Sequence, residues 1–110
     1  MSSLPSPDDY RSLSELRHRI RKFLSFSESE ARAAGIEPQQ HQLLLAVKGL
    51  PEGERLTIGT IAGRLLLRHH SVVELADRLE EKGLLVKIPS EEDRREILIK
   101  ITARGERLLA

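Results

Sequence analysis

The sequence predicts a small, mainly α-helical domain that carries one β-hairpin near its C-terminal end. Apolar residues recur at helical intervals between residues 13 and 79, and the period changes to strict alternation after Gly83. The core must be aliphatic, because the chain has only two Phe, one Tyr and no Trp. A length of 110 residues fits one domain.

The first expected helix begins near Ser12, where Ser12 and Glu15 have the spacing of a capping box. We expect residues 1–11 to form a mobile tail and residues 12–110 to form the folded domain. An apolar stripe runs along residues 12–34, and it consists of Leu13, Leu16, Ile20, Phe23 and Leu24. Because association stabilises a domain of this size, the stripe predicts a dimer interface, with Leu13, Leu16, Ile20 and Phe23 in it.

Three further helices are expected before the hairpin. Pro38 suits the first turn of a helix that runs to about Lys48, Thr57 is the N-cap of the next, and Gly83 ends the fourth. Their inward-facing residues are Leu43, Leu44 and Val47, then Ile58, Ile61, Ala62 and Leu65, then Val72, Leu75, Ala76 and Leu79. The last two helices are separated by a short join near 67–69, which predicts a helix-turn-helix.

The hairpin is expected from two alternating stretches, residues 84–88 and 97–102, which carry β-branched residues on one face. The segment between them, residues 89–96, is polar and highly charged, so it should form an exposed loop. A final helix is expected to start near Thr102 and to continue to the end of the chain.

Several functional classes are excluded by composition. The absence of cysteine excludes disulfides, thiolate metal sites and cysteine nucleophiles. The histidines, at positions 18, 41, 69 and 70, lie in no catalytic or metal-binding motif, so we expect no catalytic residues, no metal and no cofactor. No stretch has the character of a signal peptide or a transmembrane helix, which predicts a cytoplasmic protein.

The charge distribution is more informative than the net charge of +1. Residues 55–73 contain three Arg and two His and no acidic residue, whereas residues 74–82 are rich in acidic side chains. A second basic cluster consists of Arg17, Arg19, Arg21 and Lys22. Such clusters indicate either solvated helix faces or a surface for a polyanion, and the charges alone leave both open.

Four segments resemble the MarR (multiple antibiotic resistance regulator) family of bacterial transcription regulators: Leu56–Leu65, Ser71–Leu84, Asp93–Arg95 and Ile99–Gly105. The resemblance covers roughly residues 12–110. It implies a winged helix-turn-helix, in which two helices, a short strand and two further helices are followed by a strand, a charged wing, a second strand and a helix. It also implies a homodimer that binds double-stranded DNA.

The chemistry of the fourth helix agrees with this resemblance. A recognition helix presents polar or basic side chains at its N-terminal turn, because that end enters the major groove. The corresponding residues are Arg68, His69, His70 and Ser71, followed by Glu74. Two alternatives remain: Ser71 as a capping hydroxyl, and His69 and His70 as loop residues without a function.

The charged loop matches the family's wing through Asp93 and Arg95. In that family the Arg enters the minor groove and the Asp holds it by a charge-assisted hydrogen bond. Arg94 is expected to face phosphate or solvent. An exposed loop with a weak ion pair is the alternative for the wing, and Arg78 is either a structural ion-pair partner or a phosphate contact.

The C-terminal end departs from the family pattern, in which the wing is followed by one long helix and then another. Here the sequence stops after about two turns, so either the dimer is built mostly from residues 12–34 or the sequence is truncated. A small-molecule effector, which the family binds between its dimer helices and its DNA-binding lobe, is left open. A winged-helix protein-interaction module without DNA binding and a small enzyme are the competing hypotheses.

Overall fold

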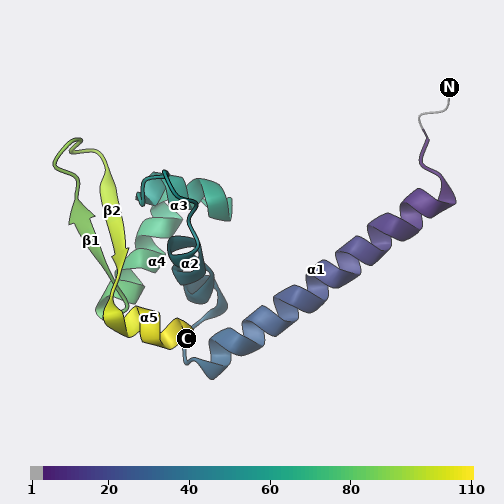
Figure 1. Ribbon diagram of the computed structural model, residues 1–110, viewed down its shortest axis with the longest axis horizontal. Helices are drawn as coiled ribbons and strands as arrows, with labels where there is room; N and C mark the ends of the chain where they lie inside the picture. The colour runs from purple at the N-terminus through teal and green to yellow at the C-terminus, as the bar shows by residue number, and fades with distance from the viewer. Residues whose placement is uncertain (1–3) are drawn as a thin grey trace.

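Residues 4–110, which the computed structural model describes, form five helices and one two-stranded hairpin (Figure 1). The elements are α1 (Pro7–Ala33), α2 (Pro38–Lys48), α3 (Ile58–Leu65), α4 (His69–Glu81), β1 (Leu85–Pro89), β2 (Ile97–Ile101) and α5 (Ala103–Leu109). Helices α2, α3 and α4 pack against one another and the hairpin packs beside them, whereas α1 extends away from this body (Figure 1). The predicted fold class is confirmed.

One core lies where α2, α3, α4 and the hairpin meet. Its largest fully buried side chains are Leu43, Leu44, Ile58, Ile61, Val72, Leu79, Leu85 and Ile99. The inward faces predicted for the three helices are confirmed, except that Leu65, at the end of α3, is only half-buried. Because burial of apolar surface is the main stabilising term, this core holds α3 and α4 in a defined relation to the hairpin.

The signals that begin and end the helices act as predicted. Thr57 caps α3 by accepting a backbone N–H at 3.0 Å, and Pro38 lies in the first turn of α2. Gly83 follows α4 with a φ of 74°, a conformation that favours glycine. Thr102 caps α5 by accepting the Gly105 N–H at 3.0 Å, and its hydroxyl donates to the Gly83 carbonyl at 2.7 Å. The end of α4 is thereby joined to the start of α5.

The predicted start of the first helix near Ser12 is wrong. Helix α1 begins at Pro7, because Ser6 and Asp9 form the capping box: the Asp9 N–H donates to Ser6 Oγ at 3.2 Å and the Ser6 N–H to the Asp9 carboxylate at 2.8 Å. Residues 7–11 of the expected tail are therefore helical. Residues 1–3 of that tail lie outside the described part of the chain.

Helix α1 contacts the body at its C-terminal end, where Ala31 is fully buried. Residues 4–26 are all exposed, including the predicted apolar stripe. At 1.5 Å per residue the 27-residue helix is about 40 Å long, and most of that length projects from the body (Figure 1). A long apolar stripe thus faces solvent in the single chain.

Strands β1 and β2 pair antiparallel, from Leu85 opposite Ile101 to Pro89 opposite Ile97. Pro89, which we expected in the loop, is the last residue of β1. The face that carries Leu85 packs on the core, and the face with Val86 and Ile88 is exposed. The sequence alternation therefore predicts the strands, and tertiary packing decides which side is covered.

The short strand expected before α3 is reduced to a single bridge. Thr57 pairs with Leu98, and the Ile99 N–H donates to the Leu56 carbonyl at 2.8 Å. This bridge connects the start of α3 to β2, so the helix-turn-helix and the hairpin form one unit. Along residues 4–110, no helix is both long enough and apolar enough to cross a bilayer.

Candidate nucleic-acid interface

Residues 66–68 join α3 to α4 in a short turn. Leu66 has a φ of 55°, a left-handed conformation that is uncommon for a bulky side chain, and it is 90% exposed. The Leu67 N–H donates to the Ala62 carbonyl at 3.0 Å and closes the turn. The predicted helix-turn-helix is thus present, and the first turn of α4 lies at the surface.

The predicted contact residues gather at this first turn of α4. Arg68 is the N-cap residue, and Arg68, His69 and His70 are all exposed. Within residues 4–110, the structure records no ion pair or side-chain hydrogen bond for these three side chains. The N-terminus of a helix also carries partial positive charge and unsatisfied N–H groups, so this turn is suited to bind an anion or a polar base edge.

Two alternatives left open by the sequence are wrong. Ser71 does not cap α4, because it is the third residue of the helix and Arg68 holds the N-cap position without a side-chain cap bond. His69 and His70 are not loop residues, since they are the first two residues of α4. Ser71 is half-buried and Glu74 is exposed one turn later, so both lie beside the exposed turn.

The outer face of α4 continues along residues spaced by four, from His70 through Glu74 to Arg78. Arg78 is exposed, and no ion pair is found for it within residues 4–110. The neighbouring Asp77 binds Lys87 of β1 instead. The ion-pair alternative for Arg78 is therefore wrong, and the helical spacing from His70 is the signal that places it on this face.

The wing is the loop of residues 90–96 between β1 and β2. Its base is closed by the Ser90 N–H, which donates to the Glu96 carbonyl at 3.2 Å. Ser90 is buried, and its hydroxyl accepts the Asp93 N–H at 3.2 Å. Arg94 is exposed, and the side chain of Arg95 is 93% exposed. The two guanidinium groups thus project from an ordered loop.

The contact between Asp93 and Arg95 differs from the expected one. Asp93 Oδ1 accepts the backbone N–H of Arg95 at 2.9 Å, whereas the Arg95 Nε lies 3.7 Å away, too far for a hydrogen bond. Asp93 therefore fixes the backbone turn, and the guanidinium of Arg95 keeps its donors free for another acceptor.

Lys87 connects the hairpin to the outer helix. Its ammonium binds the Asp77 carboxylate and lies 3.7 Å from Glu80, and its backbone N–H donates to Glu80 at 3.0 Å. The hydrogen bond with Asp77 raises the pKa of Lys87 above its ordinary value. Strand β1 and α4 are thus held together by a charged contact as well as by the core.

Arg55, in the segment between α2 and α3, binds the wing from the other side. Its guanidinium lies 2.7 Å from Glu92 and 2.8 Å from Glu96. The hydrogen bond with Glu92, and then the charge of Glu96, raise the pKa of Arg55. Arg55 could not be identified from the sequence, because its partners lie 37 and 41 positions along the chain and no local pattern connects them.

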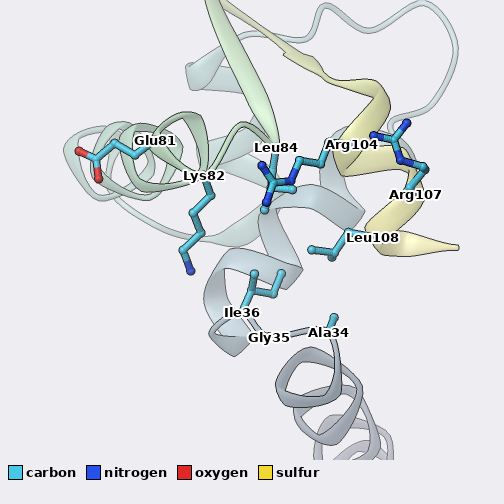
Figure 2. A pocket seen from close by; sticks show the side chains of 9 residues that line it. All are labelled: Ala34, Gly35, Ile36, Glu81, Lys82, Leu84, Arg104, Arg107 and Leu108. Atoms are coloured by element: carbon cyan, nitrogen blue, oxygen red, sulfur yellow. The ribbon is translucent and has the colours of Figure 1, made fainter.

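An open hollow of about 660 Å³ lies where the end of α1, the end of α4 and α5 meet. Figure 2 shows Ile36, Leu84 and Leu108 around it, with the cationic groups of Lys82 and Arg104 beside them. It lies between the end of α1, the helix that carries the apolar stripe, and the body of the protein. A small-molecule effector at this place stays a prediction from the resemblance.

A profile of the MarR family matches residues 34–96 of the chain. The chain belongs to the MarR family. This family consists of DNA-binding transcription regulators and not of enzymes, as the sequence predicts. The matched residues include the helix-turn-helix and the whole wing, so the family assignment rests on the surface described above.

Relatives of the chain agree with this assignment. A candidate transcriptional regulatory protein for the hcr operon of Thauera aromatica is 29% identical over 94 residues, which cover 86% of this chain and 55% of that protein. The chain thus spans little more than half the length of this curated relative.

Solved structures show the same fold. A mutant of S. aureus MepR bound to an oligodeoxyribonucleotide superposes with a TM-score of 0.70 at 23% identity, covering 88% of this chain and 70% of that one. The M. tuberculosis transcriptional regulator MOSR in complex with DNA superposes with a TM-score of 0.65 at 20% identity, covering 88% of this chain and 68% of that one. AbsC of Streptomyces coelicolor, a MarR-family regulator, superposes with a TM-score of 0.77 at 16% identity, covering 98% of this chain and 72% of that one.

Proposed function

We propose that this chain is a sequence-specific regulator of transcription that binds duplex DNA as a homodimer. One observation carries the proposal: exposed cationic side chains that form no side-chain hydrogen bond within residues 4–110 stand at the start of α4 and on the wing, on elements that one core holds together. MarR-type structures with the same fold, MepR and MOSR, are bound to DNA.

The first turn of α4 is proposed to enter the major groove. Arg68, His69 and His70 then meet phosphate or base edges, Ser71 supplies a hydroxyl, and Glu74 is suited to accept from a cytosine amino group. Arginine and histidine donors supply hydrogen bonds as well as charge, so this turn can contribute to specificity and not only to affinity.

The wing is proposed to lie along the adjacent minor groove. Arg95 is the contact in the groove, because its guanidinium has no hydrogen-bonded partner in residues 4–110 and Asp93 fixes its backbone. A narrow minor groove concentrates negative potential and so attracts arginine. Arg94 is proposed to contact the phosphate backbone.

The apolar stripe of α1 is the proposed dimer interface. Leu13, Leu16, Ile20 and Phe23 are between 46% and 65% exposed, which is costly for four large apolar side chains on one helix face. A second copy of the chain would cover them. A two-fold dimer would place the two α4 helices about 34 Å apart, one turn of DNA, on an inverted repeat.

A protein-interaction module without DNA binding is the competing hypothesis, and selection from a random duplex library separates the two. We expect the wild-type chain to enrich one sequence, called the selected duplex below, and fluorescence anisotropy with this duplex to give a steep salt dependence. Arg68→Ala and Arg95→Ala should each weaken binding by about 1–3 kcal/mol.

The matched control for these variants is Lys48→Gln, which also removes a positive charge. Lys48 pairs with Glu106 of α5, and this pair lies at the opposite end of the hairpin from the wing. Its affinity should equal that of the wild type. Failure to enrich any duplex, or equal losses in Lys48→Gln and Arg95→Ala, would contradict the proposed function.

Dimerisation has its own test. Multi-angle light scattering should give a dimer for the wild type and a monomer for Ile20→Glu, because a buried unpaired carboxylate is strongly unfavourable at an apolar interface. Ile20 is exposed in the single chain, so the fold itself should survive the substitution. A monomeric wild type, both free and on the selected duplex, would refute the dimer.

A further inference from the structure

The wing has a charge that does not suit DNA. Residues 90–96 contain four carboxylates, on Glu91, Glu92, Asp93 and Glu96, against the two guanidinium groups of Arg94 and Arg95. An acidic loop is repelled by phosphate, and close like charges weaken binding. If the wing is to contact DNA, part of this negative charge must be neutralised within the protein.

Arg55 supplies that neutralisation from outside the wing. Its Nη1 donates to Glu92 at 2.7 Å, and its Nη2 lies 2.8 Å from Glu96 and 3.5 Å from the Ser90 hydroxyl. One guanidinium therefore binds both ends of the loop. An arginine is suited to this geometry, because its planar group presents several donors at fixed angles, which a lysine cannot do.

The contact with Glu96 matters most, because Oε2 of Glu96 is buried and accepts no well-aligned hydrogen bond. Within residues 4–110, the guanidinium of Arg55 is the cationic group that lies against this oxygen. Without Arg55 the carboxylates of Glu92 and Glu96 would each lose the cation that lies beside them within residues 4–110, and the loop would lose the contact that ties it to the segment before α3.

A continuous series of contacts leads from Arg55 to the wing tip. Ser90, which Arg55 touches, accepts the Asp93 N–H, and Asp93 in turn accepts the Arg95 N–H at 2.9 Å. The backbone of Arg95 is therefore fixed by a turn whose base Arg55 holds closed. Loss of Arg55 would both release two carboxylates and loosen the residue proposed to enter the minor groove.

We propose that Arg55 is a positioning residue for DNA binding, which holds the wing loop closed and neutralises Glu92 and Glu96 so that Arg95 can enter the minor groove. The inference rests on the proposed function, because it requires Arg95 to contact DNA. Arg55 itself makes no contact with DNA in this account, since its guanidinium is already occupied by the two carboxylates.

A double-mutant cycle on the selected duplex tests this role. In the wild-type background, Arg55→Gln should weaken binding by about tenfold, and in the Arg95→Ala background by less than about threefold, because residues that act through one another are not additive. Arg55→Lys should recover part of the affinity. Lys48→Gln, which breaks a comparable ion pair between α2 and α5, should leave the affinity unchanged in both backgrounds.

The cycle separates this inference from the proposed function. If Arg95→Ala weakens binding and Arg55→Gln does not, the wing contacts DNA without help from Arg55, and the inference is wrong. Additive losses would show that Arg55 does not act through Arg95, which also overturns it. If Arg95→Ala itself has no effect, the proposed role of the wing fails first. Circular dichroism checks the fold of each variant, and Arg55→Lys replaces Arg55→Gln in the cycle if the latter does not fold.

Discussion

The change of glycine to alanine, made at Gly105 and at Gly63, tests the packing of α5 against the hairpin. Gly105 lies at that contact, and Gly63 serves as the comparison. Both lie in helices, and in both the change to Ala adds a single methyl group and gains about 1 kcal/mol of helix propensity. At Gly63 nothing lies within 4 Å of the added Cβ. Gly63→Ala should therefore stabilise the protein by about 0.5–1 kcal/mol.

The same change at Gly105 should have the opposite sign. A Cβ there would lie 2.3 Å from the Leu84 carbonyl oxygen and 2.7 Å from Ile101 Cγ1. The carbonyl cannot turn away cheaply, because it also accepts the Thr102 N–H at 3.1 Å at the junction of hairpin and α5. Overpacking against backbone costs about 1–3 kcal/mol or more, so after the gain in propensity we expect a net loss of about 2 kcal/mol.

Urea denaturation followed by circular dichroism, at one protein concentration, measures both variants. The expected difference between them is about 2.5–3 kcal/mol, which corresponds to roughly 10–15 °C in Tm for a domain of this size. If Gly105→Ala were as stable as the wild type, α5 could not lie against Leu84 as described. The junction between the hairpin and α5 would then need a different arrangement.

Three other outcomes are expected. Leu66→Gly should raise stability by about 1 kcal/mol in thermal denaturation, because the exposed leucine has a φ of 55° and loses no packing, and Leu66→Ala should not. Lys87→Met should lower stability by about 0.5–1 kcal/mol at pH 7. Because the folded-state pKa of Lys87 is raised, its contribution is present below the unfolded value near 10.4 and is lost as the pH rises through the folded value, so the two proteins should converge in urea titrations as the pH passes that value. His69→Gln/His70→Gln should bind the selected duplex more weakly than the wild type in fluorescence anisotropy, because both side chains are proposed to contact it, and overlaid binding curves would remove both residues from the interface.

The elements that could be predicted from the sequence are those set by local patterns. Thr57, Gly83 and Thr102 occupy the cap positions that their types favour, and the helical period identifies which sides of α2, α3 and α4 are buried. These features depend on residues within a few positions of one another. For the same reason, the order of helices and strands follows from the sequence alone.

The errors have local and non-local causes. The start of α1 was misplaced because the chain offers two capping boxes in succession, and the earlier one, at Ser6, begins the helix. Which face of β1 is outward, a point that the alternation leaves open, depends on which side of the hairpin meets the helices. Arg55 was missed because its role exists only once the loop before α3 lies beside the wing.

In the candidate site, too, some features follow from local sequence patterns and others from tertiary contacts. The first turn of α4 could be predicted, since a polar and basic segment after a helix-turn-helix join is a local signal. The contact of Asp93 with the Arg95 backbone depends on the turn that the wing adopts, and the pairing of Asp77 with Lys87 depends on how β1 lies against α4. Those contacts decide which cations are free for DNA, and they require the three-dimensional structure.

Footprinting the selected duplex with dimethyl sulfate reports on α4 and the wing in one experiment, because the reagent methylates guanine N7 in the major groove and adenine N3 in the minor groove. We predict protection of guanine N7 in two half-sites centred about 10 base pairs apart, with protection of adenine N3 on their flanks. Arg95→Ala should restore reactivity at adenine N3 alone, and Arg68→Ala at guanine N7. A footprint confined to one groove, or one that both variants leave unchanged, would contradict the placement of α4 and the wing on DNA.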